Sequence, residues 1–458
     1  MKVSKFGGTS VANAAQIKKV ANIVTSDPER KFIVVSAPGK RSEEDFKVTD
    51  MLIQLGNCYL NNEPFENCEE IVMERFREIV EELNLPESLL GEINDKIKQV
   101  LQMPSSNTRK LNALKAIGED SSAKILSEYL KTIGIKASYV NPKDAGIIVS
   151  YKNGNSKILP ESYEKIHQLR NLDGILVIPG FFGYTEDGQL VTFSRGGSDI
   201  SGSIIAAGVK ASLYENFTDV DSVYAVNPKI VKNPKKINTL TYKEMRELSY
   251  AGFSVFHDEA LRPAFDKKIP VCIKNTNKPE LPGTMIIAEK KQNQKCVAGI
   301  ASDTGFSSLY ISKYLMNQEV GFGRKLFGIL EDAGVSFEHA PSGIDDMTII
   351  IRDSKLSKEK EAYILKRIEE ELDPDTIKME RGLAIVMVVG EGLVSTIGIA
   401  SKATAAISNA NVNIEMINQG SSEVSMMFGI KSENLDKAVR SLYNAYFEEV
   451  ESKEKATV

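Results

Sequence analysis

The sequence is poor in the residues that most often build metal centres and hydrolytic sites. Its 458 residues include no tryptophan, three histidines and four cysteines. The histidines are His167, His257 and His339, and the cysteines are Cys58, Cys68, Cys272 and Cys296. No CxxC pair and no GxSxG motif occurs, and the histidines lie far from the cysteines in sequence. A zinc site or a serine–histidine–aspartate triad therefore has little support, and we expect the cysteines to be buried thiols.

The sequence also lacks long apolar runs and an excess of positive charge. The apolar run Leu383–Val389 is far shorter than the roughly 20 residues of a membrane span, and no charged-then-apolar leader opens the chain. The 57 basic and 62 acidic residues leave a net charge of -5, which gives no basic footprint for nucleic acid. We expect a cytoplasmic protein of about two or three domains that binds neither nucleic acid nor a membrane.

Short apolar segments alternate with helical ones over the N-terminal two-thirds of the chain. The predicted strands are 31–37, 175–184, 211–220 and 269–275, and helices are predicted after Thr49 and Ser198. This order predicts an α/β fold with a mainly parallel sheet between helices, whose ligands lie beyond the carboxyl ends of the strands. The stretch from about Asn61 to Leu101 is polar with a helical period, and we expect it to be a side excursion outside the core.

The motif KFGGTS, from Lys5 to Ser10, separates the first predicted strand from the first predicted helix. Gly7 and Gly8 allow the backbone to approach a ligand, and the helix is expected to turn its unpaired amides toward the loop. With Lys5 at the strand end, the loop predicts a seat for anionic oxygens. It is neither a Walker loop nor a GxGxxG motif. The alternative is a tight turn in which Ser10 caps the helix.

A second glycine pair occurs in FSRGGSDISGSIIAAG, where Arg195 precedes Gly196 and Gly197. Ser198 and Asp199 open the helix that is predicted next. Two glycine turns at helix starts, each preceded by a cation, can face the two ends of a transferable phosphoryl group. The alternative is a surface ion pair between Arg195 and Asp199 near a helix cap.

The C-terminal third contains an internal repeat. Gly321, Lys325, Ala333, Val335 and Glu338 recur 77 positions later as Gly398, Lys402, Ala410, Val412 and Glu415. Each copy predicts a helix, a strand, a glycine-containing turn, a second strand and an amphipathic helix, so two copies of one small α+β module follow the large domain. Paired modules of this size favour a metabolite site between them, with a dimerisation appendage as the alternative.

Several motifs together carry a family resemblance. KFGGTS, AIGEDSSAKIL around Glu119, FSRGGSDIS, FTDVDSVYAVNPK and the tandem repeats resemble the aspartate kinases of the amino acid kinase superfamily, over essentially the whole chain. The resemblance implies an amino acid kinase fold over residues 1–298 and two α+β ACT domains at 299–382 and 383–458, with a strand near 297–301 joining the second. It implies ATP-dependent phosphorylation of the L-aspartate side-chain carboxylate to 4-phospho-L-aspartate, the first step toward lysine, threonine, methionine and diaminopimelate.

An ionised carboxylate needs no general base at neutral pH, so such a kinase can work by positioning and charge neutralisation. The resemblance implies that Lys5 stabilises charge on the transferring phosphoryl group and that Asp199 orients Lys5. It also implies that Mg²⁺ is held mainly through the ATP phosphates, without a dedicated set of protein ligands.

For L-aspartate, the resemblance places Arg195 on the α-carboxylate and Glu119 on the ammonium group, with Thr49 and Ser198 beside them. Opposite charges at the two ends would reject dicarboxylates that lack the amine. Without the resemblance, the alternative for Glu119 is an acidic residue near a helix start, where the helix dipole favours it.

For the nucleotide, the resemblance implies a set of loop residues. They are Lys5, Gly7, Gly8, Ser10, Gly196, Gly197, Thr218, Asp219, Tyr224 and Lys229. A core position is the alternative for Tyr224. The chain departs from the family pattern at Ser254, where a lysine is expected, and at Asp258, where a proline is expected. The departure predicts one cationic contact fewer to the nucleotide and leaves the reaction type unchanged.

The repeats would be regulatory ACT domains that bind a feedback amino acid. The residues implied for this ligand lie in the first copy and are Met316, Gly321, Phe322, Ser336, Phe337, Glu338 and Ser342. Glu338 suits an ammonium group, and lysine fits better than threonine as the ligand. Paired ACT domains imply a homodimer or a higher homo-oligomer.

Two other functions stay open at this point. A kinase of the same fold that acts on N-acetylated glutamate is disfavoured by Glu119, because an acetylated amine carries no charge. A sensor that has lost catalysis is disfavoured by the presence of Lys5, Arg195 and Asp199.

Overall fold

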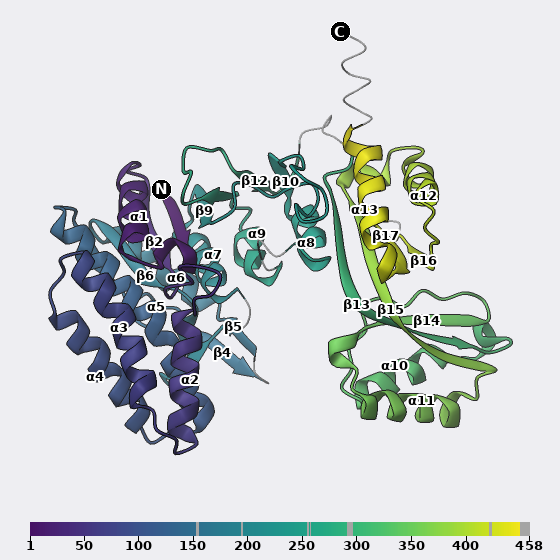
Figure 1. Cartoon of the computed structure of the whole chain (residues 1–458), viewed down its shortest axis with the longest axis horizontal. Helices are drawn as coiled ribbons and strands as arrows, with labels where there is room; N and C mark the ends of the chain where they lie inside the picture. Colours follow the sequence, from purple (N-terminus) through teal and green to yellow (C-terminus); the bar gives the residue numbers. More distant parts are fainter. Residues whose placement is uncertain are drawn as a thin grey trace, which may run out of the picture. The chain divides into compact units, whose positions relative to one another are not determined.

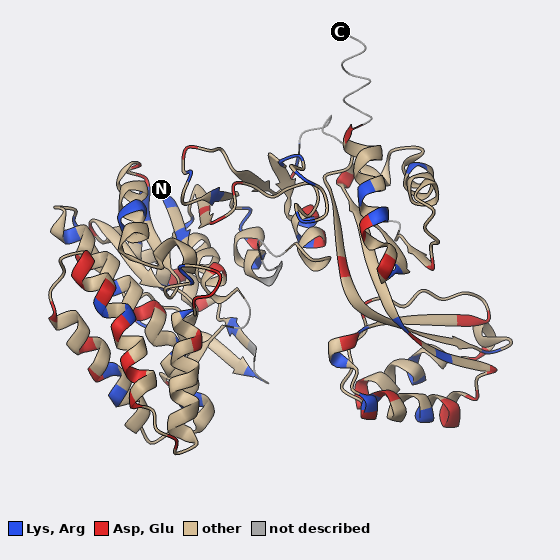
Figure 2. Ribbon diagram, viewed as in Figure 1, with Lys and Arg blue, Asp and Glu red and all other residues tan. Residues whose placement is uncertain are grey.

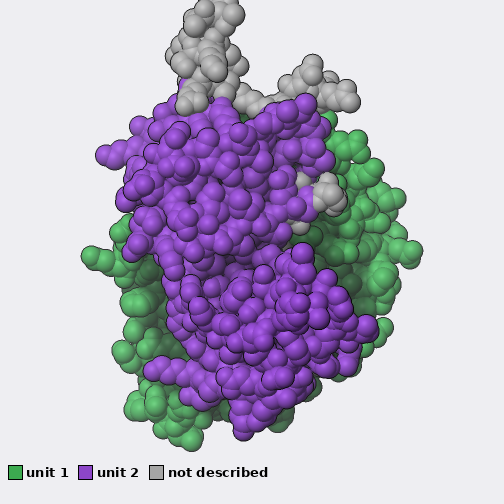
Figure 3. Space-filling view, turned by 90° about the vertical axis from the view of Figure 1, so that its right-hand side faces the viewer, with its two compact units in different colours: residues 1–223, 236–246, 254–292 green, residues 224–235, 247–253, 293–458 purple. Residues whose placement is uncertain are grey.

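The computed structural model describes residues 1–152, 155–193, 196–253, 256, 258–290, 296–420 and 424–448 (Figure 1). They belong to two compact units (Figure 3). Unit 1 contains residues 1–223, 236–246 and 254–292, and unit 2 contains residues 224–235, 247–253 and 293–458. Two short segments from the N-terminal two-thirds of the chain therefore belong to the C-terminal unit.

Unit 1 is built on a sheet that has eight strands within the described residues, in the order β10-β12-β11-β9-β1-β2-β6-β3. The strands are β1 (Lys2–Phe6), β2 (Arg30–Val35), β3 (Ala137–Tyr139), β6 (Ile175–Pro179), β9 (Leu213–Thr218), β10 (Thr239–Thr241), β11 (Val271–Asn275) and β12 (Thr284–Ile287). All strands from β11 to β3 in this order run parallel, whereas β12 is antiparallel to β11. The prediction of a mainly parallel sheet is confirmed.

The predicted strand 175–184 is interrupted. The chain turns after β6 at Phe181, whose φ of 75° is left-handed, and then enters a separate hairpin. The hairpin strands of unit 1 are β4 (Val149–Lys152), β5 (Asn155–Ile158), β7 (Phe182–Tyr184) and β8 (Leu190–Thr192). The turn brings Gly180 so close to Ser198 that a Cβ on Gly180 would lie 2.8 Å from the Ser198 Cβ.

Helices cover both faces of this sheet. The helices that belong wholly or partly to unit 1 are α1 (Ala14–Thr25), α2 (Val48–Leu60), α3 (Glu66–Glu82), α4 (Ser88–Gln102), α5 (Asn107–Thr132), α6 (Glu161–Gln168), α7 (Gly197–Val209), α8 (Tyr242–Tyr250) and α9 (Arg262–Asp266). Successive side chains of β2 point to opposite faces of the sheet. Ile33 and Val35 lie on one face, in a hydrophobic cluster with residues of α1 and α5. Helix α7 packs on β1, β2 and β9. Within the part of the chain that the structure describes, no helix has the length and apolar character needed to cross a membrane.

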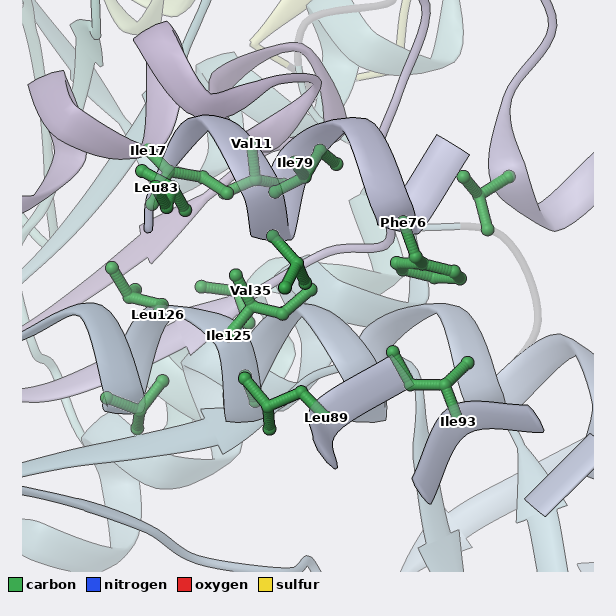
Figure 4. Packing of buried hydrophobic residues seen from close by; sticks show 14 of the residues in the cluster. Val11, Ile17, Val35, Phe76, Ile79, Leu83, Leu89, Ile93, Ile125 and Leu126 are labelled. Atoms are coloured by element: carbon green, nitrogen blue, oxygen red, sulfur yellow. The ribbon is translucent and has the colours of Figure 1, made fainter. Parts of the chain in front are cut away.

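The stretch from about Asn61 to Leu101 is helical, as expected, but the prediction that it lies outside the core is wrong. The buried side chains of α3 and α4 belong to the same hydrophobic cluster as Ile17 and Val35 (Figure 4). These side chains include Val72, Phe76, Ile79, Val80, Leu89, Ile93, Ile97 and Leu101. Helical spacing gathers the few apolar residues into one stripe, whereas acidic and basic residues occupy the rest of both helices (Figure 2).

Unit 2 is built on an antiparallel sheet that, in the described residues, has the strand order β14-β13-β15-β17-β16. The strands are β13 (Gly299–Ser312), β14 (Asp346–Arg352), β15 (Thr376–Val389), β16 (Met416–Asn418) and β17 (Ser425–Lys431), and the helices are α10 (Phe322–Asp332), α11 (Lys358–Leu372), α12 (Ile399–Asn409) and α13 (Leu435–Tyr443). The two long strands β13 and β15 are paired over nearly their whole length and run through both copies of the repeat (Figure 1).

The repeat is visible in the backbone. Gly321 and Gly398 are the N-caps of α10 and α12, with left-handed φ values of 88° and 85°. Residues Gly299–Asp303 at the start of β13 pair with Ile385–Val389 of the second copy. The first copy therefore lies, in the chain, between two strands that pair within the second.

Candidate functional site

The carboxyl ends of three neighbouring strands, β9, β1 and β2, meet at a cleft of about 480 Å³ in unit 1. The cleft is lined by Lys5, Gly7, Gly8, Thr9, Ser36, Ala37, Pro38, Gly39, Lys40, Lys47, Thr49, Glu119, Asp199, Asn216, Thr218 and Asp219. From β1 the chain moves to β2 on one side and only later to β9 on the other. Such a reversal leaves a crevice at the strand ends, which is where ligands bind in open α/β sheets.

Lys5 and Asp199 form a buried ion pair in the cleft. The Lys5 Nζ lies 2.6 Å from the Asp199 Oδ1, and the Asn216 Nδ2 donates to the same oxygen over 2.8 Å. Lys5 and Asn216 are register partners on β1 and β9, so both side chains leave the sheet on the face that α7 covers. The ammonium group of Lys5 is thus held in one position at the strand end.

The loops that follow β1 and β2 touch through glycine backbone. The Gly39 amide donates to the Gly8 carbonyl over 2.9 Å, and a Cβ on Gly39 would lie 2.6 Å from the Gly8 carbonyl carbon. A larger residue than glycine at position 39 would force the loops apart. This contact forms one continuous wall of the cleft from the KFGG turn to the segment after β2.

The expected helix start after KFGGTS is wrong in detail. A short 3₁₀ turn at Gly8–Val11 follows β1, and α1 begins only at Ala14, with Asn13 as its side-chain cap. Ser10 therefore caps no helix. It is buried, and its hydroxyl forms a 2.6 Å hydrogen bond with the Thr276 hydroxyl. Thr9, and not Ser10, is part of the cleft lining. At the predicted seat for anionic oxygens the backbone is therefore the 3₁₀ turn, because α1 begins only at Ala14.

The second glycine turn leads into α7 and supplies Asp199. Gly196 is the N-cap with a left-handed φ of 68°, and Gly197 packs so closely on Phe181 that a Cβ would lie 2.5 Å from its ring. Asp199 forms its ion pair with Lys5 in the cleft and is therefore not part of an exposed ion pair on the surface. Arg195 lies outside the described residues.

Glu119 lies in the middle of α5, so the alternative of an acidic residue near a helix start is wrong. The residue is 5% exposed, and its Oε2 has no hydrogen-bond partner among the described residues. Burial raises the pKa of this carboxyl from 4.5 to about 8, against the opposing effects of a backbone hydrogen bond at Ala37, the charge of Lys5 and the Ser198 hydroxyl. A buried, unpartnered oxygen at a cleft suits a cationic group of a ligand.

The structure brings some predicted residues into the cleft and leaves others outside it. Lys5, Gly7, Gly8, Thr49, Glu119, Asp199, Thr218 and Asp219 all line it. Ser198 contacts Glu119 and lies beside the lining. Tyr224 and Lys229 belong to unit 2. Ser254 lies outside the described residues, and Asp258 begins a short 3₁₀ helix.

The sequence interpretation missed the second wall of the cleft. Ser36 lies at the end of the predicted strand 31–37, and Gly39 and Lys40 follow it in the same way that Gly7 and Gly8 follow the first strand, which is a signal that could have found them. Lys47 lies further along an exposed loop, and no local pattern marks it.

In unit 2, the carboxylate of Glu338 is already engaged by the chain itself. Its Oε2 accepts a hydrogen bond from the hydroxyl of Tyr250, and the Arg352 Nε lies 3.6 Å from its Oε1. The Tyr250 hydroxyl also lies 3.3 Å from the His339 Nε2. Burial, with the neighbouring Glu338 carboxylate, raises the pKa of Tyr250. A ligand ammonium group at Glu338 would therefore replace an existing hydrogen bond.

The other residues expected to bind the feedback ligand lie around α10. Met316 and Phe322 are buried in the hydrophobic cluster of the first copy, and Phe337 stacks on Phe327 with 4.7 Å between ring centroids. The Ser336 hydroxyl accepts a 2.5 Å hydrogen bond from the Lys355 Nζ. Gly321 is the left-handed cap described above, and Ser342 forms a bridge to Met347.

Comparisons with known proteins give a consistent result. A model of the amino acid kinase family matches residues 1–275, and a model of an ACT domain matches residues 386–446. Aspartokinase 3 of Bacillus subtilis (strain 168) is 55% identical over 448 residues, covering 98% of this chain and 99% of the relative. The crystal structure of Clostridium acetobutylicum aspartate kinase has a TM-score of 0.87 at 42% identity, covering 97% of this chain and 100% of that one.

Two structures of E. coli aspartokinase III share the fold at 23% identity. The structure in complex with aspartate and ADP has a TM-score of 0.80 and covers 98% of this chain and 100% of that one. The structure in complex with lysine and aspartate has a TM-score of 0.72 and covers 98% of this chain and 99% of that one.

Proposed function

The chain belongs to the aspartate kinases of the amino acid kinase family, and we propose that the cleft at β9, β1 and β2 is its active site. An aspartate kinase transfers the terminal phosphoryl group of ATP to the side-chain carboxylate of L-aspartate, which forms 4-phospho-L-aspartate. This product starts the biosynthesis of lysine, threonine, methionine and diaminopimelate. The alternatives of an N-acetylglutamate kinase and of a non-catalytic sensor are no longer needed.

The buried oxygen of Glu119 is the observation that carries the assignment of the amino-acid end. A carboxylate oxygen that has no hydrogen-bond partner among the described residues, in a desolvated position, gains most from a cation, and the ammonium group of aspartate supplies one. Thr49 and Ser198 lie near it as further polar contacts, and Arg195 is assigned to the α-carboxylate.

Lys5 would neutralise charge on the transferring phosphoryl group, and Asp199 with Asn216 fixes its position. No proton has to leave the acceptor, because its carboxylate is already ionised near neutral pH. The reaction then depends on holding the ATP phosphates and the aspartate carboxylate together against their repulsion. Positioned cations and backbone hydrogen-bond donors do this.

For the nucleotide, ADP is bound in the E. coli aspartokinase III structure, which supports ATP as the phosphoryl donor here. The residues proposed for ATP in unit 1 are Lys5, Gly7, Gly8, Ser10, Gly196, Gly197, Thr218 and Asp219, whereas the assignment of Tyr224 and Lys229, which belong to unit 2, stays a prediction from the sequence. Mg²⁺ would arrive on the phosphates, because it prefers phosphate and water oxygens, and it would neutralise their charge there. The carboxylates of Asp199 and Asp219 in the lining give surroundings that fit this ion.

For regulation, we propose that a feedback amino acid binds the first ACT copy around Glu338, and that lysine is a better candidate than threonine. Lysine is present in one of the E. coli aspartokinase III structures, which supports this choice. The ammonium group of the ligand would take the place of the Tyr250 hydroxyl at Glu338. We further propose a cytoplasmic homodimer or higher homo-oligomer that forms through the ACT domains.

The experiment measures ADP release from ATP and Mg²⁺ with L-aspartate, succinate, N-acetyl-L-aspartate, L-glutamate or N-acetyl-L-glutamate, each with and without lysine or threonine. L-Aspartate is expected to be the preferred acceptor. The two aspartate analogues without a charged amine should lose about 100-fold or more in kcat/KM, because Glu119 would remain buried without a partner. Equal turnover of succinate and aspartate would contradict the role of Glu119. Inhibition by lysine at concentrations where threonine has no effect would support lysine as the feedback ligand, and the reverse would assign threonine.

A further inference from the structure

The segment between β2 and α2, residues 36–47, contributes to the lining of the cleft and is called here the β2–α2 loop. It supplies two lysines to the lining, Lys40 and Lys47. Among the described residues, the lining otherwise holds one cation, Lys5, and three acidic residues, Glu119, Asp199 and Asp219. Without the two loop lysines, the cleft would be a poor site for a triphosphate beside a dicarboxylate, because like charges repel in a partly desolvated space.

The two loop lysines differ from Lys5 in their partners. Lys5 is compensated by Asp199 at 2.6 Å. The Lys40 Nζ donates to the Glu43 carbonyl over 3.1 Å, and in the described part of the chain neither Lys40 nor Lys47 forms an ion pair with a carboxylate. Their charges are therefore not neutralised within the protein. They remain able to meet anionic oxygens of a ligand in the cleft.

The β2–α2 loop is held in place by Arg75 of α3. This side chain is almost completely buried, and its Nη2 donates to the Gly39 carbonyl over 3.1 Å, to the Phe46 carbonyl over 3.0 Å and to the Asp45 Oδ2 over 2.7 Å. Within the described chain, the Nε and Nη1 of Arg75 have no partner. The interactions of this buried charge are thus directed at the loop.

The anchor points of Arg75 flank the two lysines. Gly39 immediately precedes Lys40, and Phe46 immediately precedes Lys47. Fixing both carbonyls therefore fixes the backbone from which each lysine extends. Gly39 also touches Gly8, so Lys40 starts next to the glycine turn that is proposed to hold phosphate.

We propose that Lys40 and Lys47 bind the phosphate oxygens of ATP and that Arg75 is the residue that positions them. The proposal rests on the assignment of this cleft as the active site. Lys40 and Lys47 would touch the nucleotide directly, whereas Arg75 acts only through the loop. The other anion in the cleft is the substrate carboxylate, so the test separates the two substrates.

The test measures KM for ATP and for aspartate in Lys40→Met, Lys47→Met and the double variant. Each single change is expected to raise KM for ATP about fivefold, and the double change about 25-fold, with kcat nearly unchanged, because contacts equal in ground and transition states affect binding alone. Lys96→Met is the matched control, since Lys96 is exposed on α4 and is not part of the lining. An unchanged KM for ATP in the double variant would overturn the proposal, and a rise confined to aspartate would assign the lysines to its carboxylates instead.

The role of Arg75 is tested by non-additivity. Arg75→Met is expected to raise KM for ATP toward that of the double lysine variant, with partial recovery in Arg75→Lys or on addition of guanidinium ion. In the triple variant, Arg75→Met should add less than twofold, because the lysines that it positions are absent. A full additional effect in the triple variant would show that Arg75 acts on ATP binding by another route.

Two further measurements separate failure of this inference from other causes. Asp45→Asn weakens only one of the three contacts to Arg75, and it should raise KM for ATP about two- to threefold without unfolding the chain. If Arg75→Met does not fold, the expectation for Asp45→Asn remains testable, and an unchanged KM for ATP there would contradict the positioning role. The aspartate analogues without a charged amine test the active-site assignment, and turnover of these analogues equal to that of aspartate would contradict it. If aspartate is preferred but the Lys40 and Lys47 variants have an unchanged KM for ATP, only the present inference is refuted.

Discussion

Glu119 of unit 1 and Glu338 of unit 2 are both assigned to the ammonium group of an amino acid, yet their surroundings differ. Glu119 is buried with an oxygen that has no partner among the described residues, and burial raises the pKa of its carboxyl to about 8. Glu338 already accepts the Tyr250 hydroxyl and lies 3.6 Å from the Arg352 guanidinium.

The difference indicates two strategies for binding one chemical group. In the proposed roles, a ligand cation would relieve an unfavourable arrangement at Glu119, and binding would be strongly selective for the amine. At Glu338 the ligand would exchange with an internal hydrogen bond, so the net gain in binding free energy would be smaller. A substrate site benefits from the first strategy, and a feedback site benefits from the second.

The largest expected effect is on Glu119. Glu119→Gln should raise KM for aspartate about 100-fold, because a charge-assisted hydrogen bond in a buried position is lost. Glu128→Gln on the same helix is the control, since Glu128 forms a surface pair with Lys131 and lies outside the cleft lining.

The raised pKa of Glu119 also predicts how the melting temperature of the Glu119→Gln variant compares with that of the wild type, which tests whether the variant is folded. Because the pKa of Glu119 is raised from 4.5 to about 8 in the folded chain, the wild-type chain loses stability as pH rises between these values. The neutral glutamine avoids that loss. The variant should melt at least as high as the wild type at pH 8.5, and a much lower melting temperature would attribute the kinetic effect to misfolding.

A smaller effect is expected at the regulatory glutamate. Glu338→Gln should raise the lysine concentration for half-inhibition about 30-fold and leave uninhibited turnover unchanged. Glu415→Gln is the control, because Glu415 occupies the equivalent position of the second repeat and its carboxylate accepts a hydrogen bond from the nearby Asn413. Equal effects of the two substitutions would remove the distinction between the copies.

The pH dependence of aspartate binding tests the raised pKa of Glu119. The ammonium group requires the ionised carboxylate, so binding below pH 8 must first release a proton. KM for aspartate should fall about tenfold between pH 7 and pH 9 and then level off, because the fraction of ionised Glu119 rises in this range. Calorimetry in buffers of different ionisation enthalpy should detect the released proton at pH 7. A KM independent of pH over this range would show that Glu119 is already charged in the free enzyme.

The smallest expected effect is at Tyr250. Tyr250→Phe removes the hydroxyl that competes for Glu338, so half-inhibition by lysine should occur at about fivefold lower concentration. Tyr151→Phe, at an exposed tyrosine of unit 1, is the control. Weaker inhibition in Tyr250→Phe would mean that the hydroxyl supports the ligand-bound form, and the comparison between the two glutamates would then fail.

Local sequence patterns predicted much of the site. Lys5 lies at the end of a strand, Gly7 and Gly8 follow it, and Asp199 follows a glycine pair at a helix start, so strand-end and helix-start rules placed them near one edge of the sheet. These rules act over a few residues, and the structure bears out the proximity of Lys5 and Asp199. The assignment of Glu119 came from the family resemblance, because its neighbourhood in the sequence is ordinary.

Other features could not be predicted from local patterns. The hydrogen bond between the hydroxyls of Ser10 and Thr276 could not be predicted, because Thr276 is distant in sequence. The stretch Asn61–Leu101 looked polar because only one stripe of each helix is apolar, and burial of that stripe depends on where the helices pack. Arg75, within this stretch, has no visible role until the β2–α2 loop lies against it.

The class of fold, the two glycine turns and the repeat follow from periodicity, backbone freedom and residue type, which are all properties of short segments. The chemistry of the reaction came from the resemblance of several motifs to the aspartate kinases. The packing of the folded chain was needed to show which carboxylate has an oxygen without a partner among the described residues, which one is bonded by Tyr250, and which lysines line the cleft. Burial and pairing depend on groups brought together from distant segments, and local sequence does not specify them.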